Sequence, residues 1–488
     1  MTDSKNTISF DEKYLAAIDL GTAKIGICVA KVQERDIHIV HYNEIPSEGI
    51  QSSAIYIPLL TAKAVRKAIA EAEKELMIQI KSVVVGMPRN DVFQVSASAR
   101  LERDNPDEFV SPDEVRSIKE SALKTYPLEN PERMAIYGAV AQSFTIDEDM
   151  CLSEKEIVGT LTPAIEGNFK VFIGRKQAVL AIEKLFKKDV TIQKKYFLPE
   201  VMAKATLSKE ELKAGVALVD IGAGVTSISI YKGNVMRYYA AIPFGGKTVS
   251  GDIETECSLD EDLAERIKKR FGYCQPDKMG KENEKVLQIR LTDPYREIPV
   301  RYISEVITAR YRELIDAILF HIQESGLQNG LRGGIVLTGG AAEQNGLEAM
   351  VRELSGFNVR KGYPKPLFSA PVGSKVFCTS ATAAVGMILA ANEEGLPDCA
   401  TEIPAVEKVK PEPETVPIPE SEPIEADTSE SPAPPVSSPD PLPGKGGRGG
   451  RGGKKPPVDP DQGVLPLIWT TIKQTALKFY DDMNKLEQ

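Results

Sequence analysis

The chain has 488 residues, of which 42% are hydrophobic and 27% charged, and its formal net charge at pH 7 is −10. This length allows several globular domains, and the negative charge argues against a general nucleic-acid binder. The six cysteines include no CxxC pair and there are three histidines, so the sequence favours reduced thiols in a cytoplasmic protein and argues against a zinc site. The polar start does not resemble a signal peptide, and no apolar run reaches the ~18 residues that a bilayer-spanning helix needs.

The most informative feature is a short pattern that occurs twice. Residues 17–27 read AIDLGTAKIGI and residues 218–230 read LVDIGAGVTSISI, so each copy has an apolar run, an Asp, a Gly-rich turn and a second apolar run. The pattern predicts two buried strands joined by a tight hairpin, because glycine permits backbone conformations that other residues avoid. Such turns also let backbone N–H groups approach an anion. Asp19 and Asp220 suit a water-mediated hold on Mg²⁺ between two facing turns.

Strands and helices alternate through the first part of the chain, which implies an open sheet covered by helices. A small α+β unit is predicted to be inserted in this domain. The predicted elements, in order, are a strand at 37–42, a helix over 62–77 with Thr61 as N-cap, a strand at 82–86, an alternating strand over 92–99, a helix from Ser111 and Pro112 to about Lys124, strands at 134–144 and 157–163, a strand at 170–173 and a helix over 175–187.

The part beyond the second hairpin contains a third glycine turn, Gly339-Gly340, which follows a buried strand at 333–338. A lone diglycine turn is most often only a bend, but ligands of open α/β sheets bind where strands end in this way, and a Gly-rich loop at a helix start binds phosphate or sugar oxygens. The other predicted elements here are a strand at 235–242, the pair Gly245-Gly246, helices over 259–271 and 305–325, and a helix from about Gly346.

The last part of the chain differs in composition. From Glu393 to about Leu442 it is rich in Pro, Glu and Ser, which predicts a disordered linker, and residues 444–455 form a Gly-rich run with five positive charges. Residues 463–488 then show apolar side chains at three- and four-residue steps. A helix docking on its own domain would explain this stripe, but a helix in the membrane interface is favoured. Its apolar face comprises Leu465, Ile468, Trp469, Ile472, Phe479, Met483 and Leu486.

The basic run offers attraction to anionic lipid, at about 1 kcal/mol for each charge near the surface. Contact with RNA is the alternative for an RGG-like run, but this one lacks aromatic residues for stacking on bases. We therefore expect an anionic membrane surface, and no nucleic acid, as the partner of the tail.

Taken together, the three glycine turns resemble the actin-like ATPase superfamily and, within it, the FtsA family of bacterial cell division. VALVDIGAGVTSISIYKG with the later IPFGGKTVSGDI is similar to that family's second phosphate segment, and SEVITARYRELI is similar to its signature helix. The inserted unit lies where this family has its own subdomain. The resemblance implies an α/β, actin-like (ribonuclease H-like) fold whose two lobes close on ATP and Mg²⁺.

The resemblance also implies roles for individual residues. The first phosphate segment would be Asp19, Gly21, Thr22 and Lys24, and the second Asp220, Gly222, Gly224 and Thr226, followed by Gly245 and Gly246, with Asp19 and Asp220 holding Mg²⁺ through water. Gly339 and Gly340 would contact adenosine, and Glu265 and Lys268 would contact ribose and base. The alternative for Glu265 and Lys268 is a solvated helix pair that contributes a few tenths of a kcal/mol.

ATP hydrolysis is a separate question. Relatives that cleave ATP often place an acid or amide just before a Pro, ahead of the second phosphate segment, to orient water. Here Leu198 precedes Pro199, and the nearest acid, Glu200, would point elsewhere on the expected helix. We assign no catalytic residue beyond Glu200 as a candidate, and expect ATP binding with slow or absent turnover.

The resemblance divides the chain as follows: 13–86 and 169–199 first lobe core, 87–168 inserted subdomain, 200–252 and 333–392 second lobe core, 253–332 second lobe subdomain, 393–462 linker, and 463–488 membrane-targeting helix. It implies a protein that polymerises, tethers FtsZ filaments to the inner face of the cytoplasmic membrane at the division site and recruits later division proteins. Arg310 and Glu313 of the signature helix would bind the acidic, apolar FtsZ tail. The alternatives are a small-molecule kinase and a pilus-assembly protein of the same superfamily.

Overall fold

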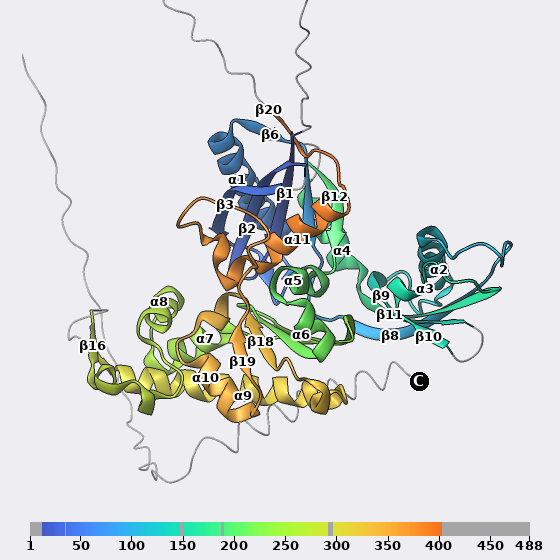
Figure 1. Ribbon diagram of the computed structural model, residues 1–488. Helices are drawn as coiled ribbons and strands as arrows, with labels where there is room; N and C mark the ends of the chain where they lie inside the picture. The colour runs from blue at the N-terminus through green and yellow to red at the C-terminus, as the bar shows by residue number, and fades with distance from the viewer. Residues whose placement is uncertain (1–11, 35, 147–149, 187–189, 291–295, 403–488) are drawn as a thin grey trace, which may run out of the picture. The chain divides into compact units, whose positions relative to one another are not determined.

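The structure is a computed structural model that describes residues 12–34, 36–146, 150–186, 190–290 and 296–402 (Figure 1). The predicted membrane helix, and the linker from residue 403 onward, lie outside the described residues. Two five-stranded sheets and one four-stranded sheet organise the described part. No helix in this part is long and apolar enough to cross a membrane.

The first sheet has the strand order β12-β7-β1-β2-β3. Its central strand β1 pairs antiparallel with β2 and parallel with β7. Alternate residues of β1 face opposite sides: Ala16 and Ile18 pack with helices α1 and α4, whereas Leu15 and Ala17 face helix α11. Both faces are therefore buried, as the apolar run predicts. The bounds are β1 Glu12–Leu20, β2 Lys24–Gln33, β3 Asp36–Pro46, β7 Ser82–Gly86, β12 Thr191–Tyr196, α1 Pro58–Leu76, α4 Lys176–Leu185 and α11 Thr382–Glu393.

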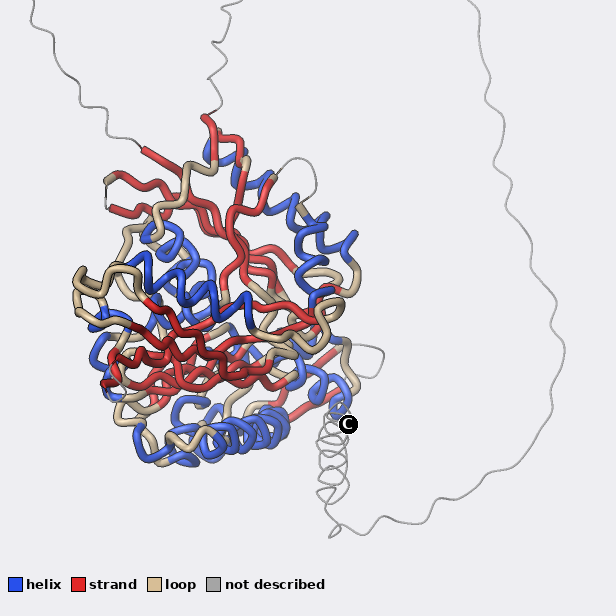
Figure 2. Tube along the Cα trace, turned by 90° about the vertical axis from the view of Figure 1, so that its right-hand side faces the viewer, coloured by secondary structure: helices blue, strands red, loops and turns tan. Residues whose placement is uncertain are grey.

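The second sheet repeats this arrangement with the order β15-β14-β13-β18-β19. Strand β13 pairs antiparallel with β14 and parallel with β18, as β1 does with β2 and β7. Ala217 and Val219 pack with helices α7 and α9, the second of which lies at the bottom of Figures 1 and 2, and Val216 and Leu218 face the other way. The bounds are β13 Val216–Ile221, β14 Thr226–Lys232, β15 Val235–Ile242, β18 Ile335–Thr338, β19 Val359–Lys361, α7 Gly246–Cys257 and α9 Val300–Glu324.

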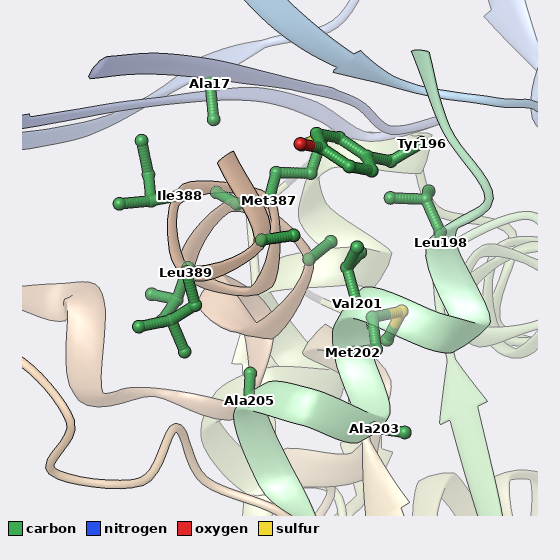
Figure 3. Close-up of a cluster of buried hydrophobic side chains, with 14 of the residues drawn as sticks. Ala17, Tyr196, Leu198, Val201, Met202, Ala203, Ala205, Met387, Ile388 and Leu389 are labelled. Carbon is green, nitrogen blue, oxygen red and sulfur yellow. The ribbon is translucent and has the colours of Figure 1, made fainter. Parts of the chain in front are cut away.

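Helices α5 (Leu198–Thr206) and α11 share one buried cluster with the inward faces of both sheets (Figure 3). The two helices approach very closely, because a Cβ added at Gly386 of α11 would lie 2.3 Å from the Val201 carbonyl oxygen of α5. Only glycine permits this approach. The pair connects the halves of the molecule whose strand ends carry the candidate site.

The inserted unit is built on the four-stranded sheet β10-β9-β11-β8, with helices α2 and α3. Its prediction is correct for α2, which begins at Pro112 after a capping box formed by Ser111 and Glu114. The strand predicted at 157–163 is wrong. Residues 158–163 contain no strand, because α3 ends at Ile157 and the next strand, β11, begins at Ala164. The strand predicted at 170–173 for the first lobe is part of β11 and pairs with β8 and β9 instead. The bounds are β8 Phe93–Glu102, α2 Pro112–Thr125, β9 Met134–Ile146, β10 Met150–Leu152, α3 Glu154–Ile157 and β11 Ala164–Arg175.

Two further boundaries differ from the prediction. Helix α1 begins at Pro58 with Ile57 as N-cap, so Thr61 lies inside its first turn and donates its hydroxyl proton to the Glu48 and Ile57 carbonyls. Residues 393–402 are not part of a disordered linker, because β20 pairs with β6 and the preceding Cys399 is buried. The remaining elements are β4 Ile50–Gln51, β5 Ala54–Ile55, β6 Ile78–Ile80, α6 Lys209–Ala214, α8 Glu261–Phe271, β16 Val286–Ile289, β17 Arg296–Pro299, α10 Leu347–Ser355, β20 Ala400–Glu402 and six short 3-10 turns.

Candidate functional site

The two copies of the sequence pattern form hairpin turns with the same geometry. The Gly21 N–H donates to the Lys24 carbonyl at 3.0 Å, and the Gly222 N–H donates to the Val225 carbonyl at 2.9 Å. A Cβ at either glycine would lie within 2.9 Å of that same carbonyl oxygen, so glycine is required because the chain folds back so closely. Each Asp is the next-to-last residue of the strand before its turn, and the predicted hairpins are confirmed.

The turns face each other across the two sheets. A Cβ at Gly224 of the second turn would lie 2.7 Å from the Thr22 hydroxyl oxygen of the first. The aspartates before the turns are joined by one guanidinium, since Arg89 donates from Nη2 to Asp19 Oδ1 at 3.1 Å and from Nη1 to Asp220 Oδ2. Asp19 and Asp220 therefore face one shared space, as the sequence pattern predicts, but an arginine from the same chain occupies that space.

Arg89 is held in place by two hydrogen bonds to its backbone. Its backbone N–H donates to Ser53 Oγ at 3.1 Å, and its carbonyl accepts a hydrogen bond of 2.6 Å from the Tyr239 hydroxyl of β15. Its side chain is 12% exposed. Burial disfavours the cation, but the carboxylates of Asp220 and Asp19 outweigh burial and raise the pKa of Arg89. The arginine therefore stays charged between the aspartates.

The arrangement fits the polyphosphate of a nucleotide better than it fits the metal ion. Glycines line all three turns, as close backbone approach to phosphate requires. Mg²⁺ does not fit between Asp19 and Asp220 here, because the guanidinium of Arg89 already bonds both carboxylates. Within the described residues no group of three or more His, Cys, Asp or Glu side chains is placed to hold a metal. The expected water-mediated Mg²⁺ site is therefore not formed in this arrangement.

Arg89 was missed by sequence reasoning, although one signal points to it. Strand β7 runs parallel to β1, with Ala17 opposite Val84 and Ile18 opposite Val85. The chain leaving β7 therefore emerges beside Asp19, at the edge where open α/β sheets bind ligands. Arg89, three positions after the end of β7, could therefore have been predicted as a site residue.

The third glycine turn lies against the same aspartate. Gly339 has a φ of +87°, and a Cβ there would lie 2.4 Å from Asp220 Oδ1. Gly339 also exchanges hydrogen bonds with Thr379, donating its N–H at 3.2 Å to the Thr379 carbonyl and accepting from the Thr379 hydroxyl at 2.8 Å. Cys378, next to Thr379, is exposed. Gly339 thus belongs to the same site as the two phosphate turns.

Glu265 and Lys268 form an internal cluster and not a solvated helix pair. Lys268 is 5% exposed, and its ammonium donates to the Gly246 carbonyl at 2.6 Å, to Ser250 Oγ at 2.8 Å and to Glu265 Oε2 at 2.6 Å. Burial acts to raise the pKa of Glu265, but the attraction of Lys268 and the Ser250 hydrogen bond outweigh it and lower that pKa to about 2. The cluster therefore fixes α8 to the start of α7.

The start of α7 is bonded to the second turn. Gly246 N–H donates to the Gly222 carbonyl at 2.9 Å, and a Cβ at Gly245 would lie 2.3 Å from that oxygen. A Cβ at Gly246 would lie 2.8 Å from Ala341 Cβ and 3.5 Å from Lys268 Nζ. Gly245, Gly246, Lys268 and the turn at Gly340 are thus brought together beside the second phosphate turn.

Two predicted phosphate-segment side chains are engaged elsewhere. Lys24 pairs with Glu44, which also accepts hydrogen bonds from the Tyr42 and Ser380 hydroxyls. Thr226 is fully buried and donates its hydroxyl proton to the Phe244 carbonyl at 3.0 Å. In this arrangement neither side chain is directed at the space between the aspartates.

Leu198 is buried beside the first phosphate turn. With Asp19, Ser53 and others it lines a cavity of about 10 Å³, which has room for about one water molecule. A Cβ at Gly86 would lie 2.6 Å from a Leu198 methyl group. Glu200, two positions later, is exposed. The apolar leucine, and not the acid, therefore lies next to Asp19.

Arg310 and Glu313 lie together on α9, in an ion-pair cluster with α7. Arg310 binds Asp252 through two hydrogen bonds, of 2.6 and 2.9 Å, and Glu313 through one of 2.6 Å. Its side chain is 24% exposed. The guanidinium thus fixes α9 to α7 while keeping one edge open to solvent.

Comparisons with known proteins agree with this geometry. The sequence model of the family described as "Cell division protein FtsA" matches residues 217–382. The chain is 26% identical over 384 residues to the cell division protein FtsA of Neisseria meningitidis, which covers 78% of this chain and 90% of that protein. It is 24% identical over 361 residues to FtsA of Bacillus subtilis, covering 72% and 79% respectively. The solved structure titled "PilM-PilN type IV pilus biogenesis complex" matches 77% of this chain and 98% of its own with a TM-score of 0.52 at 14% identity.

The doubled sheet and its facing glycine turns, together with the structural match, define an actin-like fold of the ribonuclease H-like class. Sequence similarity gives a more specific result than the fold does. The family model and the curated relatives carry the same description, that of the cell division protein FtsA. The chain is thus similar in sequence to the FtsA family of bacterial cell-division proteins.

Proposed function

We propose that this protein binds adenine nucleotide between its two five-stranded sheets and serves as a polymerising adaptor. It tethers FtsZ filaments to the inner face of the cytoplasmic membrane at the division site and recruits later division proteins. The observation that carries the nucleotide part is the convergence of the repeated hairpins, whose Asp19 and Asp220 share one guanidinium. Two Gly-rich turns that bring backbone N–H groups to one shared space form a suitable environment for a polyphosphate.

The cluster around α7 supports adenosine as the remainder of the ligand. Lys268 and Ala341 both lie close to Gly246, beside the second turn. Glu265, with its pKa lowered to about 2, is ionised at neutral pH and can accept hydrogen bonds from ribose hydroxyls. Nucleotide binding would then stabilise the contact between α7, α8 and the Gly339 turn.

The nucleotide site is tested with two glycine variants of the same helix. In Gly246→Ala the new methyl group meets Ala341 and Lys268, whereas in Gly251→Ala nothing lies within 4 Å of the added Cβ. We expect Gly246→Ala to weaken binding of a fluorescent ATP analogue at least about tenfold, equivalent to ~1.4 kcal/mol. Gly251→Ala should bind like the wild type. Equal binding by both variants, or no binding by the wild type, would contradict the proposed site.

The membrane and FtsZ parts rest on the sequence and on the family. The apolar stripe of residues 463–488 and the basic run before it favour an anionic membrane surface. The partly exposed Arg310 edge suits an acidic segment of the FtsZ tail, because a cation that is already oriented by Asp252 and Glu313 loses little side-chain entropy on binding. Filament formation would bring many such weak anchors together.

A further inference from the structure

Arg89 is a candidate-site residue that neither the repeated pattern nor the family resemblance assigns. Its guanidinium joins two carboxylates that come from different sheets, Asp19 at the end of β1 and Asp220 at the end of β13. Asp220 is 3% exposed. Within the part of the chain that the structure describes, Arg89 Nε is buried and has no hydrogen-bond partner. The arginine is therefore bonded at its two terminal nitrogens and unsatisfied at the third.

The local charges do not balance. Two ionised carboxylates and one guanidinium leave one negative charge in a largely buried space, where burial raises the pKa of Asp220 despite the attraction of Arg89, and the unsatisfied Nε–H adds a desolvation cost. An ordinary structural ion pair would satisfy these groups better, as Arg103 does with Glu114 and the Thr162 carbonyl. The position of Arg89 corresponds to that of a cation that bridges two acids, but its charge is only half that of a divalent ion.

We propose that Arg89 is an internal cation that occupies the position between the two aspartates, and that a divalent metal ion can be bound there only when the arginine side chain has left. The contact is autoinhibitory, because the guanidinium occupies the place of the metal ion and keeps the two turns together when no ligand is bound. This inference deepens the proposed nucleotide function and rests on it for its purpose, but it can be tested with no nucleotide present.

The backbone of Arg89 is suited to this behaviour. Ser53 and Tyr239 bind its N–H and carbonyl groups, so the side chain can rotate away while the main chain keeps its place. The unsatisfied Nε–H then becomes solvated, which offsets part of the loss of the two ion pairs. A polyphosphate entering with its own metal ion would take over the charge balance.

The test measures thermal unfolding of the full-length protein against Mg²⁺ concentration, without nucleotide. For the wild type we expect no shift in Tm beyond that caused by ionic strength, which KCl controls. For Arg89→Ala the two carboxylates lose their cation, so we expect a lower Tm that Mg²⁺ raises by roughly 2–5 °C when it is well above its dissociation constant. The double variant Arg89→Ala/Asp19→Asn should lose this response, because one of the two acids is gone.

Arg103→Ala is the matched control, because Arg103 is also a buried arginine but has a single carboxylate partner, Glu114. Its lower Tm should not respond to Mg²⁺. A folded Arg89→Ala protein that ignores Mg²⁺, or a wild type that gains as much from it, would overturn the proposal. If Arg89→Ala does not fold, Arg89→Lys is measured instead; a Mg²⁺ response larger than in the wild type supports the proposal and its absence overturns it. Failure of ATP-analogue binding with an intact Mg²⁺ response would refute the proposed function alone.

Discussion

At the scale of single residues, the chemistry beside the first turn depends on Leu198. A buried leucine cannot orient a water molecule for attack on phosphate, and Glu200 is an exposed residue two positions further along α5. Replacing Glu200 by Ala should therefore leave any residual rate of ATP hydrolysis within about twofold of the wild type. Phosphate release under single-turnover conditions measures the rate. A loss of tenfold or more would show that Glu200 takes part after all.

A second residue-scale prediction concerns pH. Arg103 lowers the pKa of Glu114 to about 2; burial opposes this shift, and hydrogen bonds from Ser111 support it. Because the folded pKa lies below the usual value of 4.5, the stabilisation is fully present above pH ~4.5 and is lost as the pH falls toward 2, amounting to roughly 2–3 kcal/mol.

The matching experiment compares Glu114→Gln with Glu120→Gln, whose acid is 60% exposed and lies 3.7 Å from Lys124. Urea unfolding at pH 7 should show a loss of about 2 kcal/mol for Glu114→Gln and less than about 0.5 kcal/mol for Glu120→Gln. Between pH 4.5 and 3 the difference between Glu114→Gln and the wild type should shrink. A difference that stays constant across this range would refute the assigned pKa.

At the scale of elements, α7 and α9 are coupled through Arg310, and this changes how the FtsZ proposal must be tested. A single charge reversal at Arg310 would break its bonds to Asp252 and lower stability. The double variant Arg310→Glu/Asp252→Arg keeps an ion pair between the helices but reverses the charges presented to solvent. We expect it to lose at least about tenfold in affinity for an acidic FtsZ tail peptide by fluorescence anisotropy. Affinity for nucleotide should stay unchanged. Unchanged peptide affinity in a folded double variant would mean that the tail binds elsewhere.

The elements also show what could be predicted from sequence. Local signals were sufficient where they were complete: Ser111, Pro112 and Glu114 define the start of α2, and both hairpins follow from apolar runs around glycine. Local signals failed where the contact that determines the structure joins residues far apart in the sequence. Strand β20 forms only because β6, far away in sequence, offers it an edge. Arg89 is a site residue only because parallel pairing brings the end of β7 beside β1.

At the scale of the whole molecule, the proposed membrane anchor lies outside the described residues. Sedimentation with anionic liposomes should carry down the full chain but not a chain lacking residues 463–488, and ATP should increase the bound fraction if filaments form. Within the tail, Ile472→Glu with Phe479→Glu should abolish binding, because both lie in the apolar stripe. Lys478→Gln, on the opposite face, should reduce binding only modestly. Equal sedimentation of the full and shortened chains would place the membrane contact elsewhere.

The position of one cysteine allows ligand binding at the proposed nucleotide site to be followed experimentally. Among the cysteines whose side chains the structure describes, Cys378 alone is exposed, while Cys28, Cys257, Cys274 and Cys399 are buried. Its neighbour Thr379 shares two hydrogen bonds with Gly339, which in turn lies against Asp220. A maleimide dye attached at Cys378 therefore places a reporter one residue from the ligand-facing loop, with no engineered cysteine. Its emission would report binding of nucleotide at the proposed site in the native protein.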